Sequence, residues 1–209
     1  MKSVLISIQP KWCEKILMII GKNYADKPIR KKRLELRKSK PNCETPFKAY
    51  IYCTKNKDVL WILDKPDRDI HSKIASIFTA KAVGGATKAN GKVIGEFICD
   101  YILSHCEMAN ADIAEYESCV SREDILKYSN GKEVFGWHIS DLVIYDKPRE
   151  LREFYTKCDE GCEDCDFWKS VRVNADEYDI ECSSSVYGHK PLKRPPQSWC
   201  YVKSEVQGE

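Results

Sequence analysis

The chain has 209 residues, a formal net charge of +2 and hydrophobic residues at 43% of its positions. This length and apolar content exclude a disordered chain and favour one domain with elaborations. No apolar run approaches the roughly 20 residues of a membrane-spanning helix, and the first residues lack the features of an export signal. We therefore expect a cytoplasmic protein.

The near-neutral net charge hides a strong segregation of charge along the chain. Residues 27–40 contain eight basic residues and a single acid, Glu35, whereas residues 159–181 contain nine acids and two basic residues. The first region suits contact with phosphates, and the second would repel them. The acidic region could instead bind a protein partner, which is one of three functional hypotheses.

A strand, a helix and a second strand are predicted at the N-terminus. Residues 4–8 are rich in β-branched side chains and stop before Pro10, which suits the first turn of a helix. Apolar residues then recur at helical spacing as far as Gly21, a residue typical of a helix C-cap. Residues 33–37 alternate between charged and apolar side chains, which predicts a strand with one charged face. Residues 49–54 predict the next strand.

The middle of the chain gives mixed signals. Residues 64–90 contain a helix-like centre around Ile70, Ile74 and Ile77, followed by glycine-containing turn signals. Residues 93–103 predict one long strand with apolar side chains on both faces, as a barrel strand can have.

The remaining elements are a helix and two strands. Ser121 begins a pattern typical of a capping box, which predicts the start of a helix. Residues 137–145 predict a further strand, and residues 198–202 predict a closing strand. Several short strands with few helices indicate an α+β fold built around a small barrel.

The N-terminal elements carry a recognisable motif. A helix ending at Gly21 is followed by a charged strand with Lys32, Glu35 and Arg37 in the pattern K-x-x-E-x-R. This arrangement resembles the ASCH family, whose hallmark is a helix ending in Gly and then this pattern on the second strand. Residues 22–31 lengthen the connection between the Gly and the Lys and add basic residues.

Other segments extend the same resemblance. Residues 91–97 look like the central strand of the family, and residues 137–141 and 195–202 resemble a bacterial and prophage branch. The resemblance implies a PUA-like β-barrel with flanking helices over residues 1–154. Residues 155–209 would then form an acidic, cysteine-bearing excursion and the closing strand.

The charged strand is the predicted binding site. On a strand Glu35 and Arg37 share a face with Arg33, while Lys32 belongs to the turn or the opposite face. A Glu between two arginines orients the guanidinium groups and suits a phosphate or the polar edge of a base. The alternative is an exposed ion-pair ladder worth under about 1 kcal/mol per pair.

The resemblance favours binding of RNA or a modified nucleotide in a cleft lined by residues 32–38. The residues expected to contact nucleic acid are Arg30, Lys31, Lys32, Arg33, Arg37 and Lys38.

The resemblance also implies two enzymatic activities, RNA cleavage and hydrolysis of an acylated cytidine amide. Members with the second activity use a Lys and a Thr three residues apart on this strand. Lys32 matches the Lys, but Glu35 occupies the Thr position, so a hydroxyl nucleophile is missing. A hydrolytic scheme would instead use Glu35 as the base, with Lys32 or Arg37 stabilising developing negative charge. Whether the protein is an enzyme stays open.

Eleven cysteines in a cytosolic chain indicate packing residues or metal ligands rather than disulfides. Cys158, Cys162 and Cys165 lie within eight residues, a spacing typical of a structural zinc site. Cys182 is the preferred fourth ligand, and Cys200 and His189 are alternatives. The opposing interpretation is a loop with free thiols.

Overall fold

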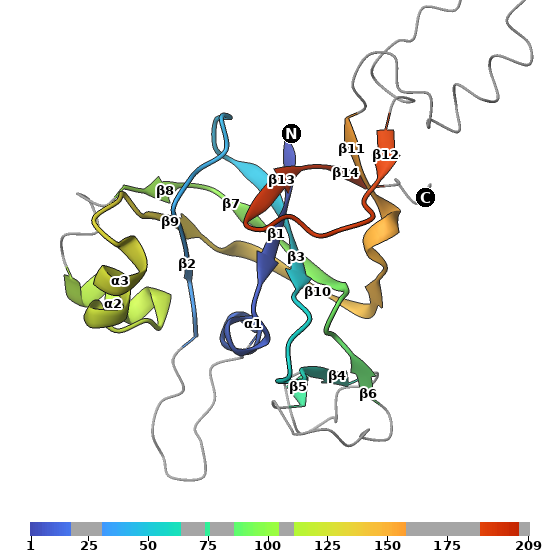
Figure 1. Ribbon diagram of the computed structural model, residues 1–209, viewed down its shortest axis with the longest axis horizontal. Helices are drawn as coiled ribbons and strands as arrows, with labels where there is room; N and C mark the ends of the chain where they lie inside the picture. Colours follow the sequence, from blue (N-terminus) through green and yellow to red (C-terminus); the bar gives the residue numbers. More distant parts are fainter. Residues whose placement is uncertain (18–30, 64–73, 76–85, 105–110, 158–188, 205–209) are drawn as a thin grey trace, which may run out of the picture.

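The computed structural model describes residues 1–17, 31–63, 74–75, 86–104, 111–157 and 189–204 (Figure 1). A five-stranded sheet with the order β10-β7-β3-β1-β13 forms the centre of the fold. These strands are Ser140–Arg149, Val93–Cys99, Phe47–Cys53, Ser3–Ile8 and Trp199–Tyr201. Strands β1 and β3 pair in parallel, and the other neighbours are antiparallel.

Three smaller sheets surround the central one. Their orders are β2-β9-β8, β5-β4-β6 and β12-β11-β14. The first comprises Leu34–Arg37, Phe135–His138 and Ile102–Leu103; the second comprises Ile74–Ala75, Trp61–Leu63 and Ala86–Lys88; the third comprises His189–Pro191, Phe154–Lys157 and Lys203–Ser204. The fold is therefore α+β, as predicted, but the strands that the structure describes form four separate sheets and no closed barrel.

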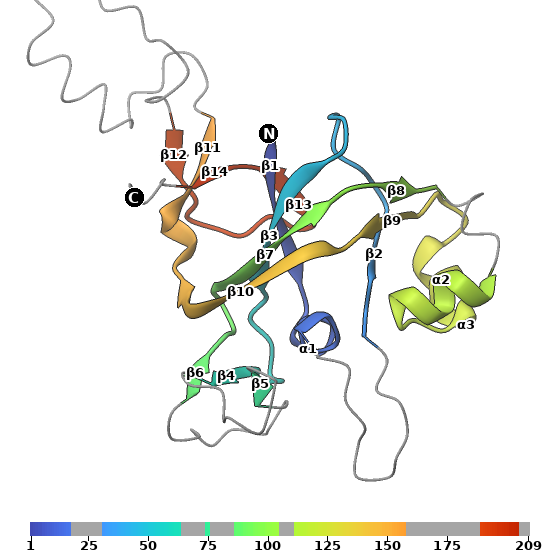
Figure 2. The same cartoon turned by 180° about the vertical axis from the view of Figure 1, so that it is seen from behind.

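The helices lie at two places around the sheets. Helix α1 (Pro10–Leu17) follows β1 directly, and helices α2 (Ala111–Ser118) and α3 (Arg122–Ser129) lie together beside β2 and β9 (Figures 1 and 2). A short 3-10 helix, η2 (Leu151–Glu153), precedes β11. In the described part of the chain, no helix is long and apolar enough to cross a membrane.

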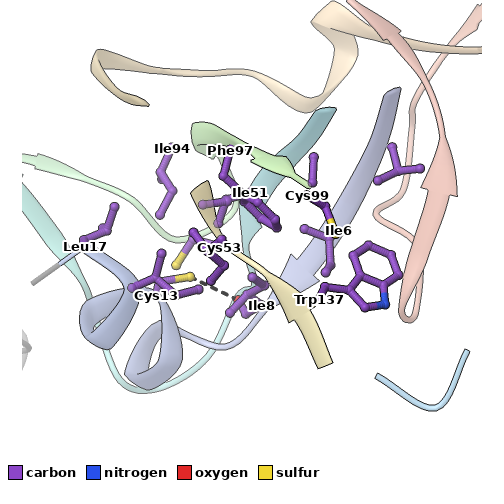
Figure 3. Packing of buried hydrophobic residues seen from close by; sticks show 14 of the residues in the cluster. Ile6, Ile8, Cys13, Leu17, Ile51, Cys53, Ile94, Phe97, Cys99 and Trp137 are labelled. Carbon is purple, nitrogen blue, oxygen red and sulfur yellow. Dashed lines mark hydrogen bonds between the residues drawn. The ribbon is translucent and has the colours of Figure 1, made fainter. Parts of the chain in front are cut away.

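The central sheet buries apolar residues on both faces. The larger cluster contains Ile6, Ile51 and Phe97 from the sheet, Cys13 from α1 and Trp137 from β9 (Figure 3). Burial raises the pKa of the Cys13 thiol, which donates a hydrogen bond to the carbonyl oxygen of Ile8 at 3.6 Å. A smaller cluster on the opposite face packs β1, β3 and β7 against the segment that begins β11.

The N-terminal and C-terminal strands are confirmed. Strand β1 covers the predicted residues 4–8, and β13 lies within the predicted residues 198–202. The two strands pair antiparallel, with Val4 opposite Tyr201 and Ile6 opposite Trp199. The last predicted strand therefore does close the sheet that contains the first.

The two long predicted strands are each divided between two sheets. Residues 93–103 form β7 and β8, which are separated at Asp100 and Tyr101 and belong to different sheets. Residues 137–145 cover parts of β9 and β10, with a break at Ile139 and a positive φ at Asp141. An apolar run shows that a strand is buried, but it does not show where the chain bends from one sheet to the next.

Two helix predictions have different outcomes. Ser121 is the N-cap of α3, and its hydroxyl accepts a hydrogen bond from the backbone N–H of Asp124 at 3.2 Å, which confirms the predicted start. The helix expected around Ile74 is wrong at that position, because Ile74 lies in β5 and pairs with Ile62. Gly21 lies outside the described residues, as do Ile70 and Ile77.

The close approach of β10 to β7 explains why β7 has a glycine at position 95. A Cβ atom at this position would lie 2.4 Å from the backbone carbonyl oxygen of Val143 in the neighbouring β10. Real Cβ atoms do not approach a backbone oxygen so closely, so a larger residue would push β10 away from β7. The contact lies where the pairing of β10 with β7 shifts its register.

Candidate functional site

The site predicted from the motif is held between two helices and a sheet. The backbone N–H of Lys32 donates to the carbonyl oxygen of Lys15 in α1, and that of Arg33 donates to the carbonyl oxygen of Glu117 in α2. Strand β2 then pairs with β9, which places Glu35 opposite Trp137. Directly opposed residues of paired strands project to the same face of the sheet, so Glu35 and Trp137 share a side of the small sheet.

Three charged side chains meet on this side. The Glu35 carboxylate lies between two cations, with Lys32 Nζ at 3.4 Å from Oε2 and Arg37 Nη2 at 3.0 Å from Oε1. Each cation also donates to a backbone carbonyl: Lys32 to Ser118 at 2.8 Å and Arg37 to Ser7 at 2.7 Å. We call Lys32, Glu35 and Arg37 the charged triad.

The triad is buried, whereas the alternation along the strand predicted only that one of its faces is charged. Lys32 is 2% exposed, Glu35 6% and Arg37 7%. All four residues of β2 are buried because the other face also packs, with Leu36 against Ala114 of α2. A surface ion-pair ladder is therefore excluded for these three residues.

The expected partners of Glu35 need one correction. The sequence placed Glu35 between Arg33 and Arg37, but the Arg33 side chain is exposed and takes no part in the triad. Lys32 takes its place. It lies before the first residue of β2, so its side chain does not have to follow the alternation of faces along that strand. Its long side chain reaches Glu35 from the segment that precedes β2.

The triad and its neighbour Trp137 leave hydrogen-bonding groups unused. Among the described residues, Arg37 Nε and Trp137 Nε1 are buried donors without a hydrogen-bond partner, and Glu35 Oε2 has no contact beyond its ion pair with Lys32. A buried polar group without a partner costs about 1–3 kcal/mol, and more when it is charged. Two buried donors, on Arg37 and Trp137, are thus left without an acceptor in the described part of the chain.

Burial also changes the proton affinity of Lys32. Desolvation lowers the pKa of its amine, and the nearby Glu35 carboxylate opposes that effect without overcoming it. The amine lies 5.1 Å from the centre of the Trp12 ring, which gives a cation–π contact. A lysine of lowered pKa beside a carboxylate can take part in proton transfer more readily than an ordinary surface lysine.

The other predicted nucleic-acid contacts lie at the surface around the triad. Arg33 and Lys38 are exposed, and Lys31 is half-buried. The Lys38 amine lies 4.9 Å from the centre of the Tyr128 ring of α3. Arg30 lies outside the described residues. The motif therefore contributes both a buried triad and exposed cations on either side of it.

Several residues around the triad were not expected from the sequence. Ser118 and Ser7 supply the carbonyl oxygens that hold the two cations. Trp199 lies 6.0 Å from Trp137 between ring centres, and its indole N–H donates to the Ser39 hydroxyl at 3.0 Å. These contacts join distant parts of the chain, so no local pattern could have indicated them.

The predicted zinc ligands Cys158, Cys162, Cys165 and Cys182 all lie outside the described residues. Of the alternatives, Cys200 lies in β13, where burial raises its thiol pKa to about 11. In the ranges that the structure describes, no group of three metal-binding side chains is found.

Two of the cavities on the surface of the described structure can be placed relative to β2. One of about 1000 Å³ lies near the end of β3, and one of about 950 Å³ lies beside residues 40–45, which follow β2. Neither is lined by residues 32–38. The predicted cleft along this strand is therefore not one of these two cavities.

No family model matches the chain, and no curated protein matches it either. The fold is similar to the crystal structure of ASCH from Zymomonas mobilis, with 16% sequence identity, a TM-score of 0.49, and coverage of 97% of this chain and 88% of that chain. Two mutants of that protein, a tyrosine-to-phenylalanine and a serine-to-alanine variant, are similar at 16% identity and a TM-score of 0.47, with 97% of this chain covered and 91% and 89% of theirs. These proteins carry the family name that the K-x-x-E-x-R motif indicated.

Proposed function

We propose that the chain is an ASCH-family protein of the PUA-like type that binds RNA or a modified nucleotide around β2. The observation that carries this proposal is the charged triad with its unused hydrogen-bonding groups. An acceptor on a base edge would complement Arg37 Nε, and a donor on the same edge would share Glu35 Oε2 with Lys32.

The burial of the triad supports a binding role over a purely structural one. Burying charges costs free energy, and replacing a buried ion pair by apolar residues is often neutral or stabilising. A folded protein gains little stability from three buried charges that still leave polar atoms without partners. A ligand that supplies the missing partners would recover part of that cost.

The exposed cations support an anionic ligand. Lys31, Arg33 and Lys38 flank the triad, and no acid among the described residues forms an ion pair with any of them. Phosphates of RNA bind such cations with an affinity that falls steeply with salt. The triad would then contact the base while its flanks contact the backbone.

We expect Glu35→Gln to weaken the binding of single-stranded RNA about 10- to 150-fold. The amide keeps the shape of the carboxylate but loses its charge, and a hydrogen bond to a charged group contributes about 1.5–3 kcal/mol. Fluorescence anisotropy with labelled RNA at low and high salt measures this effect. Urea unfolding of the variant shows whether it is folded under the binding conditions.

The flanking cations are tested by the triple variant Lys31→Ala/Arg33→Ala/Lys38→Ala. The matched control Lys88→Ala/Lys127→Ala/Lys147→Ala removes the same charge from exposed positions elsewhere. Loss of affinity in the first variant only would support the proposal. Wild-type protein that binds no RNA and no nucleotide at low salt would contradict it.

A hydrolase acting on RNA or an acylated nucleoside is the second candidate. The lowered pKa of Lys32 beside Glu35 favours it, since a carboxylate base and an amine of reduced pKa can share proton transfer. Product formation in the same RNA samples tests this candidate. Cleavage by the wild type that Glu35→Gln abolishes would assign the base, and binding without product would leave the binding function alone.

A structural zinc site at Cys158, Cys162, Cys165 and Cys182 is a further proposal, which rests on the cysteine spacing. We expect about one zinc ion per chain after purification without chelator, since four thiolates form a closed tetrahedral site. Elemental analysis checks this number. The double variant Cys162→Ser/Cys165→Ser should lose the metal, whereas Cys43→Ser should keep it; zinc-free wild type would contradict the site.

The cytoplasmic location, the prophage origin and a protein partner for the acidic region stay predictions of the sequence.

A further inference from the structure

The cavity of about 1000 Å³ lies where three parts of the chain meet. It is lined by the end of β3, the turn before β7, the start of η2 and the segment after β12. The lining residues are Tyr52, Thr54, Lys55, Gly91, Glu150, Leu151, Arg152, Pro191, Leu192, Lys193, Arg194 and Pro195. We call this cavity the basic cleft.

The charge of the basic cleft is strongly positive. Lys55, Arg152, Lys193 and Arg194 are all exposed at its walls. The one acid in the lining, Glu150, is already paired with Lys92 at 3.1 Å. Within the described ranges, Lys55, Lys193 and Arg194 form no ion pair. The cleft therefore presents cations whose charge no neighbouring carboxylate balances.

A second observation at the cleft also indicates a ligand. Tyr52 lines the cleft, and its hydroxyl forms no hydrogen bond with another residue in the part of the chain that the structure describes. Burial raises the pKa of this hydroxyl, so it stays a neutral donor at physiological pH. Buried tyrosine hydroxyls usually find a partner, and a phosphate oxygen would serve.

A single segment joins the basic cleft to the charged triad. Lys193 and Arg194 line the cleft, and a few residues later the carbonyl oxygen of Pro196 accepts a hydrogen bond from the Ser7 hydroxyl at 2.6 Å. Ser7 in turn accepts the hydrogen bond from Arg37 of the triad. The segment then reaches Trp199, which lies next to Trp137.

The two sites lie on opposite faces of the central sheet. Tyr52 belongs to the smaller apolar cluster, and Trp137 belongs to the larger one. Strand β13 is at the edge of that sheet, and the segment from residue 191 to residue 199 runs to it from the cleft. A ligand that reaches both sites must therefore be an extended chain that follows this segment around the sheet edge.

From these observations we infer that the basic cleft binds the phosphodiester backbone of the same single-stranded RNA whose base contacts the charged triad. This inference rests on the proposed function. A free mononucleotide would occupy the triad alone, whereas a longer strand would add phosphate contacts in the cleft. The cleft thus selects for polymeric RNA over small nucleotides.

The test compares a mononucleotide with a single-stranded RNA of about 16 nucleotides. The variant Lys193→Glu/Arg194→Glu reverses two cleft charges, and Lys88→Glu/Lys147→Glu makes the same change at exposed positions outside the cleft. We expect the cleft variant to bind the oligomer more weakly, with a log–log salt slope smaller by about 1.4. Its mononucleotide affinity should equal that of the wild type, as should both affinities of the control.

Three results would contradict the inference in distinguishable ways. An unchanged salt slope in the cleft variant, with oligomer binding still lost in Glu35→Gln, would overturn the cleft and leave the proposed function intact. Wild-type protein that binds neither ligand would overturn both. Equal loss of affinity for polyglutamate and for RNA would show that the cleft attracts any polyanion, which would overturn phosphate recognition.

Discussion

Replacing Glu35 by leucine is expected to lower the free energy of unfolding by about 3–5 kcal/mol. The substitution leaves Lys32 and Arg37 buried as two like charges with no carboxylate between them. Removing one partner of a buried ion pair is far more damaging than removing the whole group, because the remaining charge stays desolvated. Urea unfolding monitored by tryptophan fluorescence measures the loss.

The control for this prediction removes all three charges together. The triple variant Lys32→Met/Glu35→Leu/Arg37→Met should be much less destabilised than Glu35→Leu, and it should bind no RNA. A triple variant that is stable but binds no RNA would show that the triad is needed for binding and not for folding. A triple variant as unstable as the single one would mean that packing around β2, and not unbalanced charge, sets the cost.

Replacing Trp137 by alanine is expected to lower the free energy of unfolding by about 3–5 kcal/mol, which is the second large effect. Trp137 is 0% exposed, and it packs edge-to-face on Phe47 with ring centres 5.4 Å apart. Truncation removes the largest buried side chain of the core and leaves a cavity between β9 and the central sheet. The midpoint of urea unfolding checks this value.

Trp137→Phe separates two roles of the indole, which are packing in the core and donating a hydrogen bond to a ligand. Phenylalanine keeps an aromatic ring in the core and removes the N–H, which has no partner in the protein. We expect a smaller loss of stability than in Trp137→Ala, together with weaker RNA binding if the ligand accepts from this N–H. A phenylalanine variant as unstable as the alanine variant would show that an aromatic ring at this position does not by itself maintain the packing of the core.

The elements that depend only on residues close together in the sequence were predicted correctly. The Ser121 hydroxyl caps α3 over three residues, and Pro10 begins α1, so both could be identified from neighbouring residues alone. The β-branched run of β1 was equally clear. The Lys, Glu and Arg of the K-x-x-E-x-R motif do meet in the structure, while their role as a binding site stays a prediction.

Burial and long-range contacts could not be predicted in this way. The alternation of β2 indicated one charged face but not that both faces would be buried. Helix α2, which packs on Leu36, and strand β9, which pairs with β2, both come much later in the chain. The amine of Lys32 is held by a carbonyl 86 residues away. The break at Ile139 likewise depends on which sheets the flanking residues join, and not on their apolar character.

The position of β1 between β3 and β13 has a consequence for biosynthesis. The hydrogen bond from Ser7 to Pro196 joins residues 189 positions apart, so one side of β1 stays unpaired until the end of the chain has left the ribosome. A nascent chain that already holds β1 against β3 presents an apolar strand edge during most of its translation. Such an edge can pair with other chains until β13 covers it, and closure by a strand so distant in sequence is expected to be slow.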